Sequence, residues 1–401
     1  MRYVIIGASA AGCKAAETLR RYAPDSPITV ISDEAQPLYS RPLLTYLVSG
    51  EVAPEKVWLK GEDYFRQWNF EPLLGEPVVR VDPPAHAVHL LGGRLLPYDR
   101  LLIASGARPR LLGLKGEELS GVYTLRTLAD WQRLDAGLPQ AGRLVVVGAG
   151  AVGLKTADAL ARRGLTVTLV ARGAQPLFRV LDPTAATLLH AALTRMGIEI
   201  IYHAWPEAIW GEAGRVRALT LNDGREIPCQ AVLFSIGVAP NVEFLAGTDL
   251  ATADGITVDH QLATADPDIF AAGDCAHPFH LLTGKRAGYH IWPAAVAQGR
   301  VAGANLAGAA LSYDGLLPQN SLSLRGFHII TGGLGPQDAA GCETVSELSE
   351  RRGHYRSLIY REGKLVGLTL VGAVEDAGIY FQLMAQQLPV AGPVQPGRMW
   401  G

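Results

Sequence analysis

Residues 3–12 read Tyr3-Val-Ile-Ile-Gly-Ala-Ser-Ala-Ala-Gly12, a short apolar run that continues into a glycine-rich turn. The stretch that follows, through Tyr22, has the apolar period of a helix. After a turn that contains two prolines, Ile28-Thr-Val-Ile31 has the composition of a second buried strand. Strand, glycine turn, helix and strand in this order predict a mononucleotide-binding βαβ unit.

The same unit recurs further along the chain. Leu144-Val-Val-Val147 leads into Gly148-Ala-Gly-Ala-Val-Gly153, a helical pattern to Arg163, a stop at Gly164 and the strand pattern Thr166-Val-Thr-Leu-Val170. A single G-x-G-x-x-G motif is weak evidence, because glycine turns before helices are common. Two copies, each between a strand and a helix, predict two dinucleotide sites.

Each position of the motif has its own physical role. The first glycine allows a tight turn, the third position lets the backbone approach a pyrophosphate, and the last glycine lets helix and strand pack closely. Free N–H groups at the helix N-terminus then face the phosphates. The candidate ligands are Gly7, Ser9, Ala10, Ala11 and Gly12 in the first site and Gly148, Gly150, Ala151, Val152 and Gly153 in the second.

The residues after the second strand of each unit indicate which nucleotide it binds. A carboxylate there accepts hydrogen bonds from a ribose 2′-hydroxyl. Asp33-Glu34 supplies it in the first unit, which favours FAD. The second unit has Ala171, which does not repel a 2′-phosphate, and Arg172, which can pair with one. The residues after the second strand of this unit therefore favour NADPH over NADH, unless Arg172 is only a solvated loop residue.

Composition excludes several classes of protein. The chain has 401 residues, with 36 Lys and Arg against 38 Asp and Glu, so it carries no basic footprint for nucleic acid or an anionic membrane. A hydrophobic share of 48% with 45 glycines excludes disorder. No stretch approaches the ~18 apolar residues of a membrane helix. Four dispersed cysteines fit neither a disulfide framework nor a zinc ribbon, so we expect a cytoplasmic protein.

The expected fold class is α/β, with two Rossmann-like three-layer dinucleotide-binding domains and a small C-terminal α+β domain. Residues 71–98 alternate strand-like pieces with Pro and Gly turns and predict a β-meander. We place the domains at 1–110 (FAD, first part), 111–240 (NAD(P)), 241–314 (FAD, second part) and 315–388 (C-terminal interface domain), with a Pro/Gly-rich tail at 389–401. In the C-terminal domain we expect strands at Phe327–Thr331, Tyr355–Tyr360 and Leu365–Val371 and a helix from Asp376 to Gln387.

A longer ordered set of motifs makes the chain recognisable. It consists of Gly7–Gly12, Asp33-Glu34, Tyr39-Ser-Arg-Pro42, Ala104-Ser-Gly106, Gly148–Gly153, Ser235-Ile-Gly237, Ala271-Ala-Gly-Asp274 and Trp292-Pro-Ala-Ala-Val-Ala-Gln-Gly299. This order resembles the two-dinucleotide-binding flavoprotein family that includes NAD(P)H:rubredoxin oxidoreductases, oxygenase-coupled ferredoxin reductases and the flavin part of nitrite reductases. The rubredoxin reductase-like branch is the most similar.

The resemblance implies roles for individual residues. Asp274 corresponds to an aspartate that binds the ribityl chain of FAD, and Arg41 to an arginine that reaches back to FAD. The helix that starts at Trp292 corresponds to one whose N–H groups face the flavin's pyrimidine edge, where its dipole stabilises negative charge on the reduced ring. Further expected FAD ligands are Pro42, Val79, Ala104, Ser105, Gly106, Gly273 and Ala295, and Gly237 is expected to bind NAD(P).

Two departures from the family pattern concern the chemistry. Relatives that use a thiol carry a redox cysteine where Pro42 stands here, or a C-x4-C pair that Cys13 does not complete. No low-pKa thiolate is therefore expected. Many relatives also have Glu at the position of Lys155, paired with a lysine near whose place Tyr46 stands. Lys155 is the one candidate catalytic residue, close to nicotinamide and flavin, unless it is a solvated helix lysine.

Two weaker signals receive a structural interpretation. Cys275-x-His277-x2-His280 lacks a fourth ligand and matches no familiar metal spacing, so we expect no metal and regard Cys275 as a packed small apolar residue. The aromatic-rich stretch from Trp58 to Phe70, expected to be helical, is interpreted as core packing rather than as a binding surface.

The resemblance implies an FAD-dependent NAD(P)H oxidoreductase. It would take hydride from NADPH or NADH and pass electrons singly to rubredoxin or a small iron–sulfur protein. Reverse flow to NAD(P)+ is an open alternative. So are an NAD(P)H oxidase that uses O2 and a non-catalytic nucleotide sensor. We expect a monomer or homodimer without nucleic-acid or membrane partners.

Overall fold

The structure is a computed structural model that describes residues 1–387 and residue 389. Its chain divides into two units, each with its own sheets and core. The first comprises Met1–Pro42, Pro54–Arg108 and Val238–Leu316, and the second comprises Leu43–Ala53, Pro109–Gly237 and the chain from Leu317 onward. The domain boundaries expected from the sequence stay predictions.

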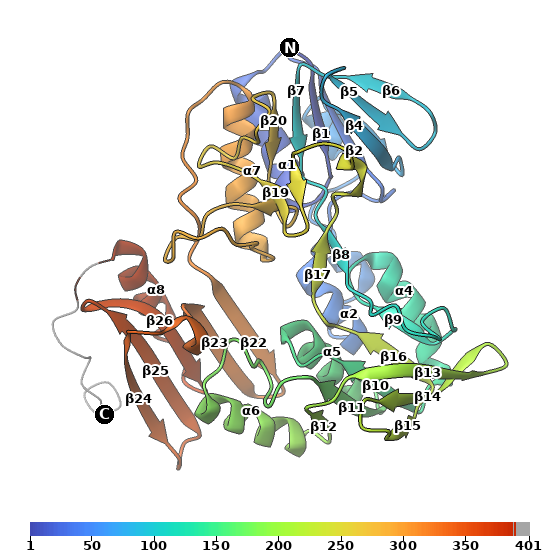
Figure 1. Ribbon diagram of the computed structural model, residues 1–401, viewed down its shortest axis with the longest axis vertical. Helices are drawn as coiled ribbons and strands as arrows, with labels where there is room; N and C mark the ends of the chain where they lie inside the picture. Colours follow the sequence, from blue (N-terminus) through green and yellow to red (C-terminus); the bar gives the residue numbers. More distant parts are fainter. Residues whose placement is uncertain (388, 390–401) are drawn as a thin grey trace. The chain divides into compact units, whose positions relative to one another are not determined.

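The first unit is built on a parallel sheet in the order β20-β7-β1-β2-β3 (Figure 1). Its strands are β1 (Tyr3–Ile6), β2 (Ile28–Ser32), β3 (Glu71–Leu74), β7 (Arg100–Ile103) and β20 (Ile269–Ala271). In β1, every residue is buried, and Tyr3 is in register with Ile28 on one side and Arg100 on the other. Such a continuous apolar run is typical of a central parallel strand that is covered on both faces.

Helices α1 (Ala10–Tyr22) and α7 (Trp292–Leu306) pack side by side in this unit (Figure 1). Glycine permits the contact. A β-carbon at Gly299 would overlap the carbonyl oxygen of Ala11, and one at Gly303 would overlap that of Ala15. The close approach fixes the two helices whose N-termini follow the motifs assigned to FAD.

The predicted meander is present as β4 (Val78–Asp82), β5 (Ala87–Leu90) and β6 (Leu95–Pro97), which pair antiparallel. The prediction is wrong for Glu71–Leu74, which pair parallel with β2 and extend the main sheet. Pro72 is compatible with this edge position because an edge strand has one side without a hydrogen-bonding partner.

Short elements complete the first unit, and two of them end one residue into the second. They are η1 (Arg41–Leu43), η2 (Pro54–Lys56), α3 (Tyr64–Gln67), η4 (Glu243–Leu245), the sheet of β18 (Ala251–Thr252), β19 (Gly255–Thr257) and β21 (Ala276–His277), and the ribbon of β8 (Ala107–Pro109) and β17 (Val238–Pro240). The aromatic stretch is helical only in α3, so its expected helix is too long. Its core role is confirmed for Tyr64, Phe65 and Phe70, which are buried, whereas Trp58 is 39% exposed.

The second unit repeats the parallel arrangement, in the order β12-β11-β10-β16-β9. The strands are β9 (Val122–Thr124), β10 (Arg143–Val147), β11 (Thr166–Ala171), β12 (Glu199–Tyr202) and β16 (Ala231–Phe234). The helical elements are α2 (Leu44–Ser49), α4 (Leu128–Gly137), η3 (Leu138–Gln140), α5 (Ala151–Arg162) and α6 (Pro183–Arg195). A further antiparallel sheet contains β13 (Pro206–Glu212), β14 (Arg215–Leu221) and β15 (Glu226–Pro228).

The C-terminal part of this unit is an antiparallel sheet in the order β22-β23-β26-β25-β24. Its elements are β22 (Gln319–Leu324), β23 (Phe327–Gly333), η5 (Pro336–Asp338), β24 (Glu343–Ser349), β25 (His354–Arg361), β26 (Lys364–Val371) and α8 (Ala377–Gln386). The three predicted strands and the predicted helix are confirmed. The edge strands β22 and β24 were not predicted because their mostly exposed, polar residues carry little apolar signal. The predicted tail, apart from Pro389, lies outside the described residues.

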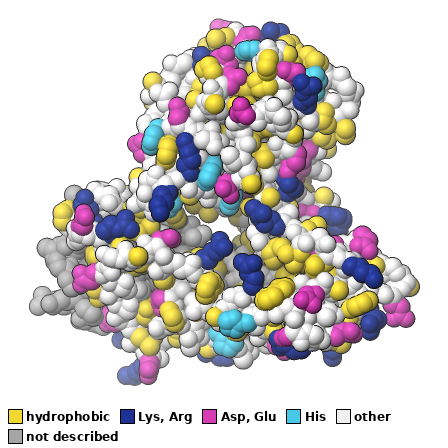
Figure 2. Space-filling view, viewed as in Figure 1, with side chains coloured by type: hydrophobic (Ala, Val, Ile, Leu, Met, Phe, Trp, Pro, Cys, Tyr) yellow, Lys and Arg dark blue, Asp and Glu magenta, His cyan; other side chains and the backbone are white. Residues whose placement is uncertain are grey.

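The predicted α/β class with two Rossmann-like arrangements is therefore confirmed. On the face shown in Figure 2, cationic and anionic side chains are interspersed over each unit. Within the described part of the chain, no helix has both the length and the apolar character to cross a membrane.

Candidate active site

The first glycine turn connects β1 to α1 with close backbone contacts. Gly7 has φ +114°, and a β-carbon there would overlap the carbonyl oxygen of Ala104. A β-carbon at Gly12 would overlap the carbonyl oxygen of Gly7. Ser9 is the N-cap of α1, but its side chain does not cap the helix. The first N–H groups of α1 are therefore available to an anion.

The second glycine turn, between β10 and α5, has the same geometry. A β-carbon at Gly148 would overlap the carbonyl oxygen of Ser235, and one at Gly153 would overlap that of Gly148. Gly150 is different, since no atom lies within 4 Å of its β-carbon position. Gly150 caps α5 without a side chain, and the first turn of α5 has no acidic residue. This turn has open space at the position where a pyrophosphate must approach.

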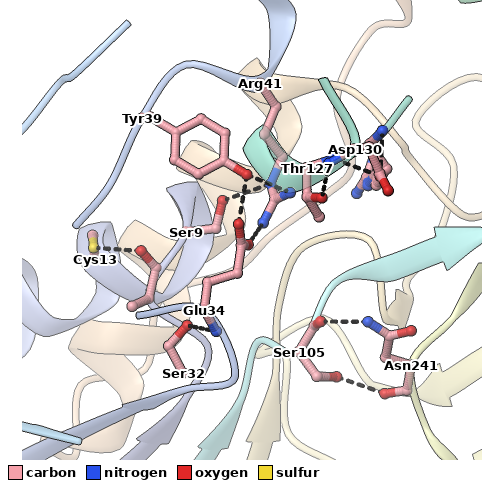
Figure 3. Close-up of polar contacts among 12 residues, drawn as sticks. Ser9, Cys13, Ser32, Glu34, Tyr39, Arg41, Ser105, Thr127, Asp130 and Asn241 are labelled. Atoms are coloured by element: carbon pink, nitrogen blue, oxygen red, sulfur yellow. Dashed lines mark hydrogen bonds and ion pairs between the residues drawn. The ribbon is translucent and has the colours of Figure 1, made fainter. Parts of the chain in front are cut away.

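Residues of the loop after β2 contact the first turn (Figure 3). Arg41 forms an ion pair with Glu34, and the Tyr39 hydroxyl donates to the same carboxylate over 2.6 Å. The Arg41 Nε donates to Ser9 Oγ over 3.4 Å. Three predicted FAD ligands, Ser9, Glu34 and Arg41, are thus brought together, whereas the Asp33 side chain is exposed.

The predicted Ala104–Gly106 turn is held by a residue that the sequence analysis missed. Ser105 Oγ donates to the Asn241 carbonyl oxygen over 2.6 Å, and Asn241 Nδ2 donates to the Ser105 carbonyl oxygen over 3.0 Å (Figure 3). Asn241 follows β17, directly after Pro240. Its only signal in the sequence is that position, a few residues beyond Gly237.

The Gly273-Asp274 turn is held by α7. The Gly273 N–H donates to Gln298 Oε1 over 2.7 Å, and Gln298 Nε2 donates to the Tyr313 hydroxyl over 3.2 Å. Gln298 is fully buried. It lies inside the motif that begins at Trp292 but was not predicted as a site residue. Asp274 is half-buried, and Ala295 is buried in the first turns of α7.

The two cysteines nearest to these turns are not thiolates. Cys13 Sγ donates to the Ala8 carbonyl oxygen over 3.2 Å, and burial raises the pKa of the Cys13 thiol to about 12. Cys275 Sγ lies 3.4 Å from the carbonyl oxygens of Ile103 and Ala272, and burial raises its pKa as well. The interpretation of Cys275 as a packed small residue is confirmed.

Lys155 and Tyr46 are in contact in the second unit. The Lys155 ammonium donates to the Tyr46 hydroxyl over 3.3 Å and lies 5.0 Å from the centre of its ring. Both residues line a polar cavity of about 180 Å³ between α2, α5 and the β22–β23 turn. In its wall, Asp158 pairs with Arg162 and Arg325. Among the described residues, no carboxylate lies within ion-pair distance of the Lys155 ammonium, whose recorded polar contact is the Tyr46 hydroxyl.

Arg172 lies directly after β11, at the carboxyl end of the second sheet. Its side chain is exposed, and Ala171 is 3% exposed. The following loop returns to the glycine turn, where the Leu177 N–H donates to the Ala149 carbonyl oxygen over 3.0 Å. Arg172 is therefore part of a loop that is anchored to the second nucleotide turn.

Of the remaining predicted site residues, Ala10 and Ala11 are buried in the first turn of α1, and several others lie at exposed positions. Val79 on β4 is 47% exposed, Val152 on α5 is 49% exposed, and Ala151 and Pro42 are also exposed. Gly237 has φ +99° and open space around its β-carbon position. The roles of these residues stay predictions. Within residues 1–387, no group of three His, Cys, Asp or Glu side chains is placed to hold a metal ion, and this includes the Cys275–His280 loop.

The chain resembles known proteins over nearly its whole length. The profile of the pyridine nucleotide-disulphide oxidoreductase family matches residues 1–299. The NADH-dependent phenylglyoxylate dehydrogenase subunit epsilon of Aromatoleum evansii is 30% identical over 99% of this chain and 96% of that protein. Rhodocoxin reductase of Rhodococcus erythropolis is 38% identical over 69% of this chain and 65% of that protein.

A solved structure supports the same assignment. The ferredoxin reductase from Rhodopseudomonas palustris is 32% identical, with a TM-score of 0.86 over 94% of this chain and 93% of that one. The two glycine turns and these similarities agree with one another. The chain belongs to the pyridine nucleotide-disulphide oxidoreductase family.

Proposed function

We propose that the protein is an FAD-dependent NAD(P)H oxidoreductase that passes electrons to a small redox protein. One observation carries the proposal: the chain holds two glycine turns with available helix N-termini, but the cysteines beside the first turn are buried and protonated. Two dinucleotide sites without a reactive thiol support transfer from nicotinamide to a bound flavin and on to an external acceptor.

The residues of the first unit fit FAD. The Gly7–Gly12 turn would hold the pyrophosphate, while Glu34 and Arg41 would bind the adenosine side. Gln298 fixes Gly273 and so positions Asp274 for the ribityl chain. Bound FAD supplies the capacity to accept two electrons together and to release them singly. The protein orients the reactants, and this step requires no side-chain acid or base.

The names of similar proteins support a small redox protein as the acceptor. Rhodocoxin reductase and the Rhodopseudomonas palustris ferredoxin reductase act, by name, on such carriers. A rubredoxin or a small iron–sulfur protein is the carrier class that we propose for this chain. Four free cysteines agree with a reducing compartment, and we place the protein in the cytoplasm as a monomer or homodimer.

For the nicotinamide we propose NADPH as the preferred nucleotide. Ala171 and the exposed Arg172 carry this proposal, because together they remove a repelling carboxylate and offer a cation to a 2′-phosphate. The Aromatoleum evansii relative is NADH-dependent by name, so under this proposal the two proteins would differ in nucleotide preference.

A second candidate is electron transfer in the opposite direction, to NAD(P)+. It is favoured by the match that covers both chains almost completely, because that relative is a subunit of a dehydrogenase. In this role the protein would take electrons from a partner enzyme and reduce the nucleotide.

The test uses the purified, FAD-loaded protein. We expect one FAD per chain and rapid NADPH-dependent reduction of ferricyanide and rubredoxin, with slow consumption of O2. Colourless protein that does not bind added FAD contradicts the proposal. O2 turnover as fast as rubredoxin turnover identifies an oxidase, and slow turnover with every acceptor identifies a nucleotide sensor. Faster NADP+ reduction by a reduced iron–sulfur protein than the forward reaction identifies the second candidate.

A further inference from the structure

The loop between β11 and α6 comprises residues 172–182 and begins at the carboxyl end of the second parallel sheet (Figure 1). In a dinucleotide fold the pyrophosphate lies at the glycine turn, and the adenosine ribose lies at the end of the next strand. The adenine then extends past that strand end. The 172–182 loop is therefore the part of the second unit that would border the adenine of a bound nucleotide.

The middle of the loop has a strained backbone. Leu177 has φ +50°, in the left-handed region that a bulky side chain seldom adopts. Its N–H donates to the Ala149 carbonyl oxygen over 3.0 Å, and its carbonyl oxygen accepts from the Val180 N–H over 2.7 Å. These two bonds hold the conformation and fix the loop on the nucleotide turn. Strain of this kind is concentrated at ligand-binding sites, where the surrounding contacts maintain it.

Phe178 follows directly, and contacts on two sides fix its position. Its carbonyl oxygen accepts a hydrogen bond from Gln337 Nε2 over 3.1 Å. A β-carbon at Gly173 would lie 2.9 Å from Cβ and 3.0 Å from Cγ of Phe178, so the side chain packs directly on the Gly173 backbone. Only a residue without a β-carbon allows this approach. Phe178 is nevertheless 50% exposed.

Phe178 is not part of a hydrophobic core. Within the described loop, Leu181 belongs to the core of the second unit, and Leu177 and Val180 pack against that core, but Phe178 does not. A single exposed apolar side chain is common on protein surfaces and needs no explanation by itself. Here the exposed ring is held by its neighbours and rests on the residue that follows Arg172. The structure thus presents a fixed aromatic face beside the position proposed for the 2′-phosphate.

We propose that Phe178 stacks against the adenine ring of the nicotinamide nucleotide. This proposal rests on the proposed function. A flat ring that is already ordered binds a base through its face at little entropic cost. Arg172 and Phe178 would then have separate tasks. Arg172 distinguishes NADPH from NADH, whereas Phe178 recognises the adenine that both nucleotides contain.

The experiment compares FAD-loaded wild type with three variants of this residue. Phe178→Ala removes the ring, Phe178→Leu keeps apolar volume without a flat face, and Phe178→Tyr keeps the flat face. Each is assayed, with ferricyanide as the acceptor, on NADPH, on NADH and on reduced nicotinamide mononucleotide, which lacks the adenosine half. Trp210→Ala is the matched control, because Trp210 is an aromatic residue of the same unit that is 42% exposed, on β13. FAD content and thermal unfolding show that each variant is folded.

We expect Phe178→Ala to raise the KM for NADPH and the KM for NADH by the same factor, about tenfold, with little change in kcat. Phe178→Leu should resemble Phe178→Ala, and Phe178→Tyr should resemble wild type. The kcat/KM for reduced nicotinamide mononucleotide should be the same in every variant, and Trp210→Ala should match wild type with all three substrates.

Three results overturn the stacking role alone. The first is a wild-type KM for both dinucleotides in Phe178→Ala. The second is a wild-type KM in Phe178→Leu, because apolar volume rather than the aromatic face then accounts for the effect. The third is an equal loss of kcat/KM with reduced nicotinamide mononucleotide, because the substitution then disturbs the site outside the adenosine half. Wild type that binds FAD but oxidises neither NADPH nor NADH overturns both this proposal and the proposed function.

Discussion

Lys155 donates a hydrogen bond to the hydroxyl of Tyr46, with the nitrogen and oxygen 3.3 Å apart. Lys155 lies one turn into α5, immediately after the nucleotide turn, and Tyr46 lies on α2 close to Pro42. The pair therefore joins the helix that starts at the proposed NAD(P) turn to the segment that follows the proposed FAD ligand Arg41. The family resemblance implies a carboxylate at the position of Lys155 in many relatives, paired with a lysine near whose place Tyr46 stands.

The first prediction concerns this pair. Lys155→Met should lower kcat/KM for NADPH about tenfold without loss of FAD, because the cation proposed to lie close to the nicotinamide is removed. Tyr46→Phe keeps the ring and should have a smaller effect. Stopped-flow bleaching of the flavin measures the hydride step directly. Wild-type bleaching rates in Lys155→Met would show that Lys155 is only a solvated helix lysine.

The second prediction uses two glycines that both have open space around the β-carbon position, Gly150 and Gly61. Gly150→Ala should fold and retain FAD, but should raise the KM for NADPH about tenfold because its methyl group occupies the path of the pyrophosphate. Gly61→Ala, outside the turn, should leave the KM unchanged. Equal KM values for Gly150→Ala and wild type would place the nucleotide elsewhere.

The third prediction concerns the thiols. Burial raises the pKa of Cys13 from 9.0 to about 12, so the thiol stays protonated and unreactive at neutral pH. Gentle alkylation should modify the partly exposed Cys342 and leave NADPH-to-acceptor turnover largely intact. Cys13→Ser and Cys275→Ser should also turn over with FAD bound. A large loss of activity in either variant with full FAD content would reveal a redox thiol.

The same pKa gives a stability prediction with a definite sign. Because the Cys13 pKa is higher in the folded state, the folded protein retains a proton that the unfolded chain loses between pH 9.0 and about 12. The contribution of Cys13 to stability therefore falls as pH rises through this window and is constant below it. Denaturant unfolding across this pH window measures the free energy of unfolding of wild type and of Cys13→Ala. The difference between the two free energies should narrow as the pH rises.

The fourth prediction concerns nucleotide preference. A charge-assisted pair between arginine and phosphate contributes about 1.5–3 kcal/mol, which corresponds to a roughly tenfold to hundredfold preference for NADPH. Because Arg172 is exposed, we expect a preference toward the lower end of this range. Arg172→Ala should raise the KM for NADPH and leave the KM for NADH nearly unchanged. Ala171→Glu should invert the preference. Better use of NADH than NADPH by wild type would show that Arg172 is only a surface residue.

The fifth prediction concerns Asp158, whose side chain is 5% exposed and pairs with Arg162 and Arg325. Asp158→Ala should lower the free energy of unfolding by about 2 kcal/mol. This is below the cost for a fully buried pair, because the arginines remain 31% and 35% exposed. Asp63→Ala breaks a surface ion pair with Arg66, in which the Arg66 side chain is 80% exposed and that of Asp63 is 59% exposed. This variant should lower the free energy of unfolding by at most about 0.5 kcal/mol. Equal losses in the two variants would contradict the prediction.

The sequence by itself determined the two βαβ units and the positions of their glycines. These features are local: a buried strand, a turn and an amphipathic helix follow one another, and only glycine fits where backbone atoms approach as closely as at Gly7 and Gly12. The family resemblance added the prediction that no thiol acts at the flavin, because it implies that Pro42 occupies the place of the redox cysteine. The structure adds that Cys13 is buried.

Only the tertiary structure decided which distant residues support the site. Asn241 holds Ser105 from far along the chain, and Gln298 holds Gly273. Such pairs have no period and no fixed spacing, since they depend on how separate strands and helices pack. The same reason explains β3, whose residues resemble a meander strand until pairing with β2 places them in the parallel sheet. Local chemistry therefore set the nucleotide turns, and long-range packing set the side chains that hold them.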